Sequence, residues 1–322
     1  MFRHALAGGL ILLGSTFAPA HAQSTYPNRA VTLVVPLSAG GTADILARIV
    51  AEKLREVLGQ PVIVENRPGG AGGMVGTESV VKAGPDGYTL LWAPQLTFSI
   101  AHLLYTKLSF DPRALEPISV IATYPASLLG RPDLPANNTA ELLAYARANP
   151  GRINYGSQGN GQIGHLTAAL LMHLGNVKLV HVPFRGSAPA LTALLAGQID
   201  ILADLMPASK PHIEGGKIKL LGVASRERLK SFPDVQAIGE VLPGFESDTW
   251  MAMAAPPGTS KDVINKLADA VGQVFRMPDV RARIAALQVE PLGSSPAQMR
   301  DLIRISAERW TPVIQATKIT IE

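Results

Sequence analysis

The chain has 322 residues, of which 29 are Lys or Arg and 25 are Asp or Glu, and it contains no cysteine. The formal net charge of +4 is spread along the chain without a long basic run, which argues against a nucleic-acid partner. The lack of cysteine excludes disulfide bonds, thiol nucleophiles, thiolate metal sites and a lipid anchor on an N-terminal cysteine. Stability must therefore come from buried apolar surface, and the length suffices for one or two hydrophobic cores.

The first residues have the pattern of a cleaved signal peptide. Arg3 precedes an uncharged run from Ala5 to Phe17, and Ala20-His21-Ala22 supplies the small residues that signal peptidase requires. A membrane anchor is the alternative, but the run is shorter than the roughly 20 apolar residues of a membrane span. We therefore expect residues 1–22 to be removed by cleavage after Ala22 and the mature chain to be secreted.

Between Val31 and Ile201, short β-branched runs alternate with segments of helical periodicity, which is typical of parallel strands joined by crossover helices. The clearest helix is predicted over residues 42–58, where apolar residues gather on one face and most charged residues lie away from it. The predicted strands are 31–36, 61–66, 88–92, 153–155, 179–182, 199–203 and 219–224.

The last quarter of the chain is different, because helical periodicity dominates it. Helices are predicted at 261–275, 279–287 and 296–310, after one strand-like run at 250–254. Helices that follow a completed α/β pattern usually pack on an earlier sheet, so we expect the first domain to be discontinuous. The predicted division is residues 23–123 plus 247–322 for domain one and 124–246 for domain two, with strand-like crossings near 119–124 and 248–253 as the hinge.

Two glycine-rich loops of matching design each follow a predicted strand and precede a predicted helix. They are Leu-Ser-Ala-Gly-Gly-Thr at 37–42 and Gly-Ser-Gln-Gly-Asn-Gly-Gln at 156–162. A helix N-terminus carries about half a positive charge and up to about four unpartnered N–H groups, so it can hold a carboxylate or phosphate without Lys or Arg. Ligands of α/β sheets collect at the carboxyl ends of strands, where both loops must lie, so the pair predicts two jaws around one anion.

Each loop taken alone is also explained by a tight turn, since glycine adopts positive φ without strain. The match between two loops in separate halves of the chain favours the binding role. A third cluster, Gly69 to Gly73 around Ala71, leaves two interpretations open, a flexible rim or a third source of amides.

Several motifs suggest an enzyme but are incomplete. Gly159-x-Gly161-x-x-Gly164 fits the dinucleotide fingerprint, yet the acidic residue expected about 20 positions later is missing, because no Asp or Glu occurs between Glu141 and Asp200. The serine of Gly156-Ser157-Gln158-Gly159 lacks the glycine that a nucleophile elbow needs two residues earlier. We therefore predict no catalytic residues and no cofactor.

The histidines offer no metal site by their spacing. His165, His173 and His181 recur every eight residues, which does not match the i, i+4 pairs of helical zinc ligands, and no H-E-x-x-H motif occurs. We predict that the chain binds no metal.

A set of short motifs in fixed order resembles the Bug family, the periplasmic substrate-binding receptors of tripartite tricarboxylate transporters (TctC-like proteins). The resemblance covers essentially the whole mature chain. The motifs are Tyr26-Pro27-Asn28-Arg29, Val34-Val35-Pro36, Ala39-Gly40-Gly41-Thr42-Ala43-Asp44, Val64-Glu65-Asn66-Arg67-Pro68-Gly69, Pro85-Asp86-Gly87-Tyr88-Thr89-Leu90, Gly159-Asn160-Gly161, His181-Val182-Pro183-Phe184-Arg185-Gly186 and Pro233-Asp234-Val235.

The resemblance implies a periplasmic protein with a type II periplasmic-binding fold, in which two Rossmann-like α/β domains joined by a two-strand hinge close on a ligand. It further implies that amides of both glycine loops hold the ligand carboxylate, with Asp44 capping the first helix. Asp204 also has a structural interpretation, as an acceptor for neighbouring amides. The implied ligand-binding residues are Ala39, Gly40, Gly41, Thr42, Ser157, Gly159, Asn160, Gly161, Gln162, Arg185 and Asp204.

The chain departs from the family pattern at three positions of the expected pocket wall. Leu37 stands where an aromatic residue is usual, Ala203 where Phe is usual, and Leu205 where Asn is usual. These smaller or more apolar residues predict a bulkier ligand, such as an aromatic or branched carboxylate. The expected partners are this acid and the membrane permease subunits of a tripartite tricarboxylate transporter, with the receptor itself a monomer. A sensory ligand carrier that reports to a membrane kinase is the alternative, and a periplasmic enzyme is the least favoured.

Overall fold

The computed structural model describes residues 26–287, 289–317 and 319–321, so the predicted signal peptide lies outside the described residues. The strands are β1 (Val31–Val35), β2 (Val62–Asn66), β3 (Thr89–Pro94), β4 (Glu116–Gly130), β5 (Asn154–Ser157), β6 (Val180–Pro183), β7 (Ile201–Leu205), β8 (Lys219–Val223), β9 (Asp248–Ala255) and β10 (Glu290–Pro291). The helices are α1 (Thr42–Leu58), α2 (Met74–Val81), α3 (Ala101–Leu104), α4 (Thr139–Ala148), α5 (Ile163–Gly175), α6 (Ser187–Leu195), α7 (Met206–Glu214), α8 (Lys261–Arg276), α9 (Pro278–Ala285) and α10 (Pro296–Thr317), with a π-helical turn at Leu96–Ile100.

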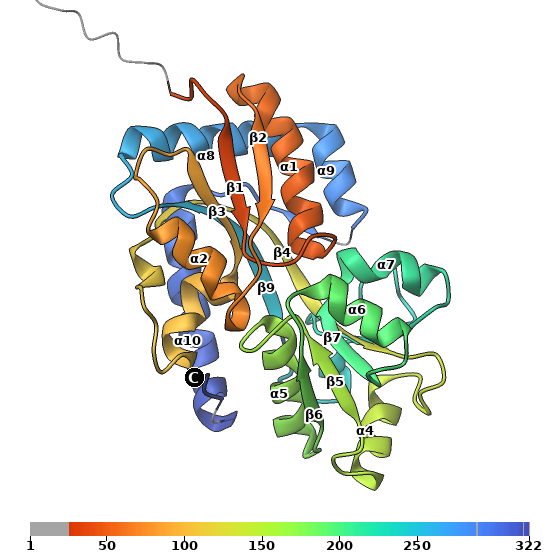
Figure 1. Ribbon diagram of the computed structural model, residues 1–322. Coiled ribbons are helices and arrows are strands. Elements are labelled where there is room, and N and C mark those ends of the chain that lie inside the picture. Colours follow the sequence, from red (N-terminus) through yellow and green to blue (C-terminus); the bar gives the residue numbers. More distant parts are fainter. Residues whose placement is uncertain (1–25, 288, 318, 322) are drawn as a thin grey trace, which may run out of the picture.

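The strands form a mixed sheet in the order β2-β1-β3-β9-β4-β7-β5-β6, and β8 and β10 also pair with β4. The elements divide into two lobes, which Figure 1 shows one above the other. The first lobe contains β1 to β3 with α1, α2, α8, α9 and α10, and the second contains β5 to β8 with α4 to α7. None of the helices described is both long and apolar enough to cross a membrane.

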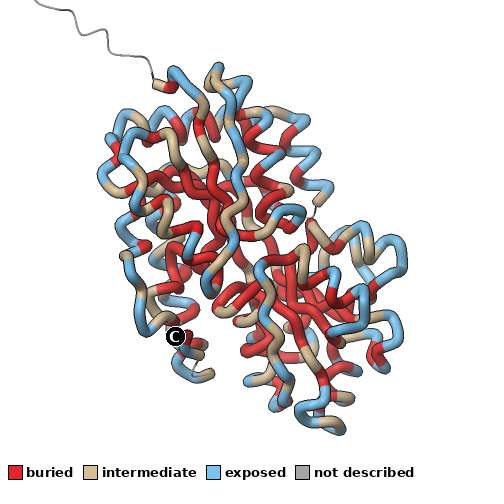
Figure 2. The backbone as a smooth tube through the Cα atoms, in the orientation of Figure 1, coloured by how far each residue is buried: buried red, intermediate tan, exposed pale blue. Residues whose placement is uncertain are grey.

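Alternation along β1 explains why helices cover both faces of the first lobe. Successive side chains of a strand point to opposite faces of its sheet. Leu33 and Val35 belong to the core cluster that includes residues of α1 and α8, whereas Val34 belongs to the cluster that includes residues of α2 and α10. Buried residues therefore follow the strands through the interior of each lobe (Figure 2).

Strand β4 connects the two lobes and is much longer than the run predicted at 119–124. Its first part, Glu116 to Pro125, pairs antiparallel with β9, and its last part, Ala126 to Gly130, pairs antiparallel with β7. Among the named strands described, the parallel pairs are β1 with β2 and β3, and β5 with β6 and β7. The expected α/β alternation is thus correct within each lobe, while the strands between the lobes are antiparallel.

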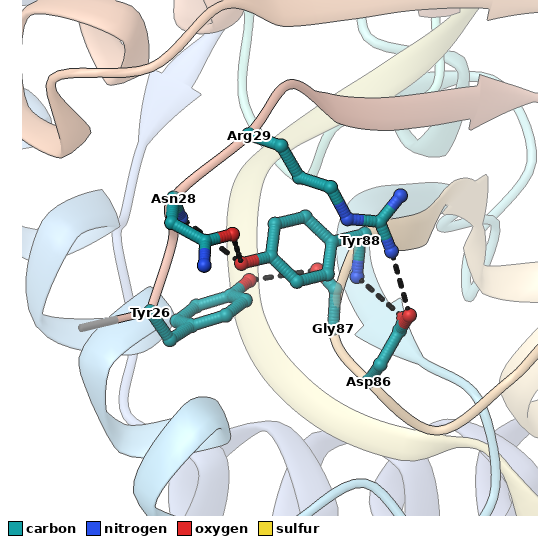
Figure 3. A network of polar contacts seen from close by, with 6 residues as sticks. All are labelled: Tyr26, Asn28, Arg29, Asp86, Gly87 and Tyr88. Carbon is teal, nitrogen blue, oxygen red and sulfur yellow. Dashed lines mark hydrogen bonds and ion pairs between the residues drawn. The ribbon is translucent and has the colours of Figure 1, made fainter. Parts of the chain in front are cut away.

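The first described residues are bound to the turn before β3 (Figure 3). The hydroxyl of Tyr26 donates to the carbonyl oxygen of Gly87 at 2.7 Å, and the hydroxyl of Tyr88 donates to Asn28 Oδ1 at 2.8 Å. The guanidinium of Arg29 lies over the ring of Tyr88, 4.0 Å from its centroid. Two of the motifs that carry the family resemblance therefore meet each other and hold the first lobe together.

Replacing Gly87 with Ala is expected to destabilise the protein by about 2 kcal/mol or more. The φ of Gly87 is +80°, and an added Cβ would lie 2.4 Å from Val263 Cγ1 and 2.9 Å from Tyr26 Oη. Left-handed backbone costs a non-glycine residue about 1–2 kcal/mol, and overpacking adds about 1–3 kcal/mol. Urea unfolding measures the loss. Gly84→Ala is the matched control, because nothing lies within 4 Å of its added Cβ; equal stabilities of the two variants would contradict this account.

Candidate ligand-binding site

The first glycine loop, residues 37–42, joins β1 to α1 and so lies at the carboxyl end of β1. Asp44 Oδ2 accepts the N–H of Gly40 at 2.9 Å, and Gly41 is the N-cap of α1 without a side-chain capping bond. In the described chain no hydrogen bond is recorded for the amides of Ala39, Gly41 and Thr42. The loop thus engages one of its amides internally and leaves others at a helix N-terminus.

The carboxylate that engages Gly40 is itself neutralised. Asp44 is 4% exposed and pairs with Arg48 one helical turn later, at 2.9 Å from Nη2 to Oδ1. Burial acts to raise the pKa of Asp44, but the hydrogen bonds from Arg48 and from the amide of Gly40 hold this pKa below its ordinary value. Asp44 therefore braces the loop as an ion pair and does not leave a bare negative charge to repel an anion.

The second glycine loop, residues 156–162, runs from the end of β5 to α5 and has its own internal bonds. The amide of Gly159 donates to Ser157 Oγ at 3.2 Å, and the amide of Gly161 donates to His165 Nδ1 at 3.0 Å. No partner is recorded for the amide of Asn160 within the described residues. As in the first loop, some backbone amides are engaged by internal hydrogen bonds, whereas another remains available to a ligand.

The third glycine cluster contacts the second loop across the lobe boundary. Gln162 Nε2 donates to the carbonyl oxygen of Gly72 at 2.8 Å, and both Gln162 and Gly72 are buried. An added Cβ on Gly72 would lie 2.5 Å from Tyr105 Oη and 3.1 Å from the carbonyl oxygen of Asn160. The cluster thus contributes a carbonyl acceptor and lies close to the backbone of the second loop. The sequence analysis had considered only a flexible rim or a third source of amides.

A fourth segment, residues 184–188 between β6 and α6, lies against both glycine loops. The amide of Ser38 donates to the carbonyl oxygen of Arg185 at 3.2 Å, and the position of an added Cβ on Gly41 is 3.4 Å from Ser187 Cβ. On the other side, an added Cβ on Gly159 would lie 3.1 Å from the carbonyl oxygen of Phe184. The two loops named from the sequence therefore converge on one segment of the second lobe.

Asp204 lies at the end of β7 and links two of these segments. It is 0% exposed, and its Oδ1 accepts hydrogen bonds from Ser187 Oγ at 2.7 Å and from Gln158 Nε2. Burial raises its pKa to about 6, although the bonds from Ser187, Gln158 and the Leu205 amide act to lower it. Asp204 therefore acts as a structural hydrogen-bond acceptor, which is one of the two roles that the sequence analysis left open for it.

Several buried polar atoms beside the loops have no hydrogen-bond partner among the described residues. On the first loop these are Ser38 Oγ and Thr42 Oγ1, and in the second lobe Asp204 Oδ2. Tyr124 Oη, on β4, is a further case. A buried polar group without a partner costs about 1–3 kcal/mol, so such atoms are natural contacts for a ligand or for water.

The side chains of the remaining predicted residues are either exposed or buried in the core. The side chain of Arg185 is exposed, and the recorded contact of this residue is made by its main chain. Leu37, Ala203 and Leu205 are buried in the main hydrophobic core, and Ala203 is 0% exposed. Because alternate residues of a strand face opposite sides, Ala203 and Leu205 lie on the face of β7 away from Asp204.

Sequence reasoning missed several residues that hold the loops together. Ser38 of the first loop bonds to Arg185, Gly72 bonds to Gln162 of the second loop, and Ser187 bonds to Asp204. Ser187 carried a usable signal, since it is the first residue of a helix that follows a predicted strand. His165 and His181 carried none, because their partners on the second loop are fixed only by how β5, β6 and α5 pack.

Comparisons with known proteins agree with this architecture. The family model for the tripartite tricarboxylate transporter family receptor matches residues 46–319. The structure of the periplasmic binding protein BugD is similar, with a TM-score of 0.88 and 34% sequence identity over 92% of this chain and 100% of that one. The expected α/β periplasmic-binding fold is thereby confirmed.

Two similar structures contain a bound acid. A Rhodopseudomonas palustris protein whose structure holds adipate has a TM-score of 0.88 and 33% identity, over 92% of this chain and 99% of that one. MatC from the same species, with bound malate, has a TM-score of 0.85 and 33% identity, over 90% of this chain and 100% of that one.

Replacing Asp204 with Asn is expected to change how stability depends on pH. The pKa of Asp204 is raised from 3.8 to about 6 by folding, so the folded protein binds this proton more tightly than the unfolded chain. The contribution of Asp204 is therefore most favourable below pH 3.8 and is lost as the pH rises through about 6. Since a pKa difference of one corresponds to about 1.4 kcal/mol, wild type should lose up to about 3 kcal/mol relative to Asp204→Asn between pH 4 and pH 7.

Urea unfolding of both proteins at pH 4 and pH 7 measures this difference. Asn keeps an oxygen for Ser187 and Gln158, so the variant is expected to fold. Parallel pH profiles for the two proteins would contradict the raised pKa. Asp200→Asn alters an acid just before β7 that bonds to Arg131 and to the amide of Asn154 and not to this network, so it tests whether any aspartate substitution has the same effect.

Proposed function

The chain belongs to the tripartite tricarboxylate transporter receptor family, and we propose that it is a periplasmic receptor that captures a small carboxylate between its two glycine loops. The observation that carries the proposal is the first loop. It places the unpartnered hydroxyls of Ser38 and Thr42 beside the uncapped N-terminus of α1. A carboxylate there would satisfy both hydroxyls and the free amides, and it would face the positive end of the helix dipole.

Fewer amides are proposed to bind the ligand than the sequence analysis named. Those of Gly40, Gly159 and Gly161 already have acceptors in Asp44, Ser157 and His165. The remaining donors are the amides of Ala39, Gly41 and Thr42 on the first loop and of Asn160 on the second. In this assignment the three engaged glycines shape the loops, while their neighbours contact the acid.

Capture is proposed to close the two lobes around the acid. The moving bodies are residues 23–123 plus 247–322 and residues 124–246, with β4 and β9 as the hinge strands. A ligand that touches both loops binds the closed arrangement more tightly than the open one and shifts the equilibrium toward it. The bond from Gln162 to Gly72 supports this proposal, because it crosses from one body to the other.

The closed receptor is proposed to act as a monomer in the periplasm and to deliver its acid unchanged to the membrane permease subunits of a tripartite tricarboxylate transporter. The ligand is proposed to be an aromatic or branched acid bulkier than malate. Of the three departures that suggested this, Ala203 and Leu205 lie in the core, so the proposal now depends on Leu37 of the first loop. A screen of acids tests this better than Ala203→Phe. The side chain at position 203 is packed in the core, and overpacking there would cost about 1–3 kcal/mol of stability.

Binding of organic acids is expected to depend on the hydroxyl of Thr42. Calorimetric titration of the mature chain with malate, adipate, a branched acid and benzoate should give a saturable isotherm with at least one of them. A hydrogen bond to a charged group contributes about 1.5–3 kcal/mol, so Thr42→Val should weaken that binding tenfold or more, and Ser38→Ala should act in the same direction.

Thr311→Val serves as the control, since it removes a threonine hydroxyl on α10, in the C-terminal part of the first lobe. The absence of binding by all four acids would remove support for the carboxylate. Wild-type affinity in Thr42→Val would refute the role of the first loop, and tightest binding of malate would refute the argument from ligand size.

The bond between Gln162 and Gly72 is expected to favour the closed lobes even without ligand. A hydrogen bond of this kind contributes about 1 kcal/mol net, so Gln162→Leu should shift the ligand-free equilibrium about fivefold toward the open state. Distances between spin labels on the two lobes measure the shift. Gln198→Leu, at an exposed position, is the control. An unchanged distance distribution in Gln162→Leu would show that the bond does not hold the lobes.

A further inference from the structure

Three rings stack behind the second glycine loop. Tyr155 of β5 stacks on His181 of β6 with centroids 4.7 Å apart, and His181 stacks on His165 of α5 with centroids 4.2 Å apart. The interplanar angles are 14° and 15°, so the three rings are nearly parallel. Strands β5 and β6 lie side by side with α5 next to them in Figure 1, and the second loop begins where β5 ends.

Each imidazole binds one group of the loop. His165 Nδ1 accepts the amide N–H of Gly161 at 3.0 Å, and His181 Nε2 lies 2.7 Å from Ser157 Oγ. A hydroxyl can donate or accept, so the bond to Ser157 is compatible with either protonation state of His181. A backbone amide only donates. The bond to Gly161 therefore requires that Nδ1 of His165 carries no proton and that its ring is neutral.

We propose that His165 and His181 are positioning residues that hold the second loop in its ligand-binding shape, and that protonation of His165 releases this loop and weakens ligand binding. This inference rests on the proposed function of the loop. A proton on Nδ1 would face the N–H of Gly161, donor against donor, so either the ring or the loop must move. The loop that moves carries the free amide of Asn160 and the Gln162 side chain that reaches Gly72.

The described lining of the cavity beside the stack provides no countercharge. A cavity of about 540 Å³ adjoins it, and its titratable residues besides His165 and His181 are Tyr155 and His173. The first lobe contributes Thr317, the last residue of α10, and Ile319 and Thr320 just after it to the lining. None of the described lining residues is Asp, Glu, Lys or Arg.

The remaining elements packed on α5 do not offset a proton on His165 either. On β7, Asp204 bonds to Gln158 and Ser187, and on β4, Tyr124 is uncharged at neutral pH. Burial lowers the pKa of His165 to about 4. For His181, burial and then repulsion from His165 lower the pKa to about 3. Both rings are thus neutral at neutral pH, and the switch operates in acid.

The sign of the effect follows from the bond. The closed loop accepts only neutral His165, so affinity is full above the pKa of this residue and falls as the pH drops below it. One proton must be lost for each ligand bound, which gives about a tenfold loss of affinity for each pH unit below about 4.

Three variants separate this effect from titration of the ligand's own carboxyl group. His165→Asn retains an acceptor for Gly161 and does not titrate, so it should bind adipate as wild type does at pH 7 and lack the extra loss in acid. His165→Leu removes the acceptor and should weaken binding about fivefold at pH 7. His173→Asn changes an exposed histidine of the same cavity that has no recorded bond to the loop, and should follow wild type throughout.

The readout that does not need a ligand is the amide of Gly161 itself. In wild type, its ¹⁵N shift is expected to titrate with the ring of His165 and its hydrogen exchange to be slow at pH 7, whereas exchange should be faster in His165→Leu and slow in His165→Asn. Thermal melting at pH 7 checks that each variant is folded.

These outcomes distinguish the two proposals. If neither adipate nor any other acid binds, the proposed function fails, and the behaviour of the Gly161 amide still tests the bond to His165. If acids bind but His165→Asn loses affinity in acid as steeply as wild type, or the exchange of Gly161 is the same in all variants, His165 does not position the loop.

Discussion

The site depends on backbone segments that approach one another closely with no side chain between them. Between the lobes, an added Cβ on Gly72 would lie 3.1 Å from the carbonyl oxygen of Asn160, and within the second lobe one on Gly159 would lie 3.1 Å from the carbonyl oxygen of Phe184. Glycine lets these segments come this near, and the same lack of side chains leaves N–H groups uncovered at the ends of α1 and α5. Close contact between the lobes and exposure of amides to a ligand thus have one physical cause.

A second principle is that each loop commits some amides to its own shape. Asp44, Ser157 and His165 accept the N–H groups of Gly40, Gly159 and Gly161, and each of these acceptors is itself held by a neighbour or by ring stacking. A loop held in this way loses little conformational entropy when a ligand arrives. The charge of the acceptors matters equally. Asp44 is ion-paired with Arg48, and burial keeps His165 uncharged, so neither of these two acceptors places an unpaired charge beside the free amides.

The motifs that carry the family resemblance divide into two kinds once they are placed in the fold. Tyr26 to Arg29 and Asp86 to Tyr88 bind each other at the outer end of the first lobe, as Figure 3 shows, and they serve stability. The motifs around Gly40, Gly159 and Gly186 converge between the lobes. His181 is the first residue of the motif that ends at Gly186, and its ring also contacts Ser157 of the second loop.

The sequence by itself determined the local elements, the α/β class and the two loops. Helix α1 has the bounds its periodicity predicts, because one apolar face over seventeen residues admits no other burial. Local patterns also placed Ala39 to Thr42 and Ser157 to Gln162 at strand ends. They were insufficient where pairing is remote: the full length of β4, its antiparallel partners, and α10, which runs on to Thr317, all depend on contacts with distant strands and helices.

Tertiary structure alone decided which amides remain free and which residues brace them. The bond from Gln162 to Gly72 joins residues 90 positions apart, and that from Gln158 to Asp204 joins residues 46 apart. Alternation on β7 also turned Ala203 and Leu205 into the core, away from Asp204, which no comparison of residue sizes along the chain could indicate. Periodicity records only whether a residue is buried. The partner it meets there is set by how the lobes pack, and that determines the chemistry of the site.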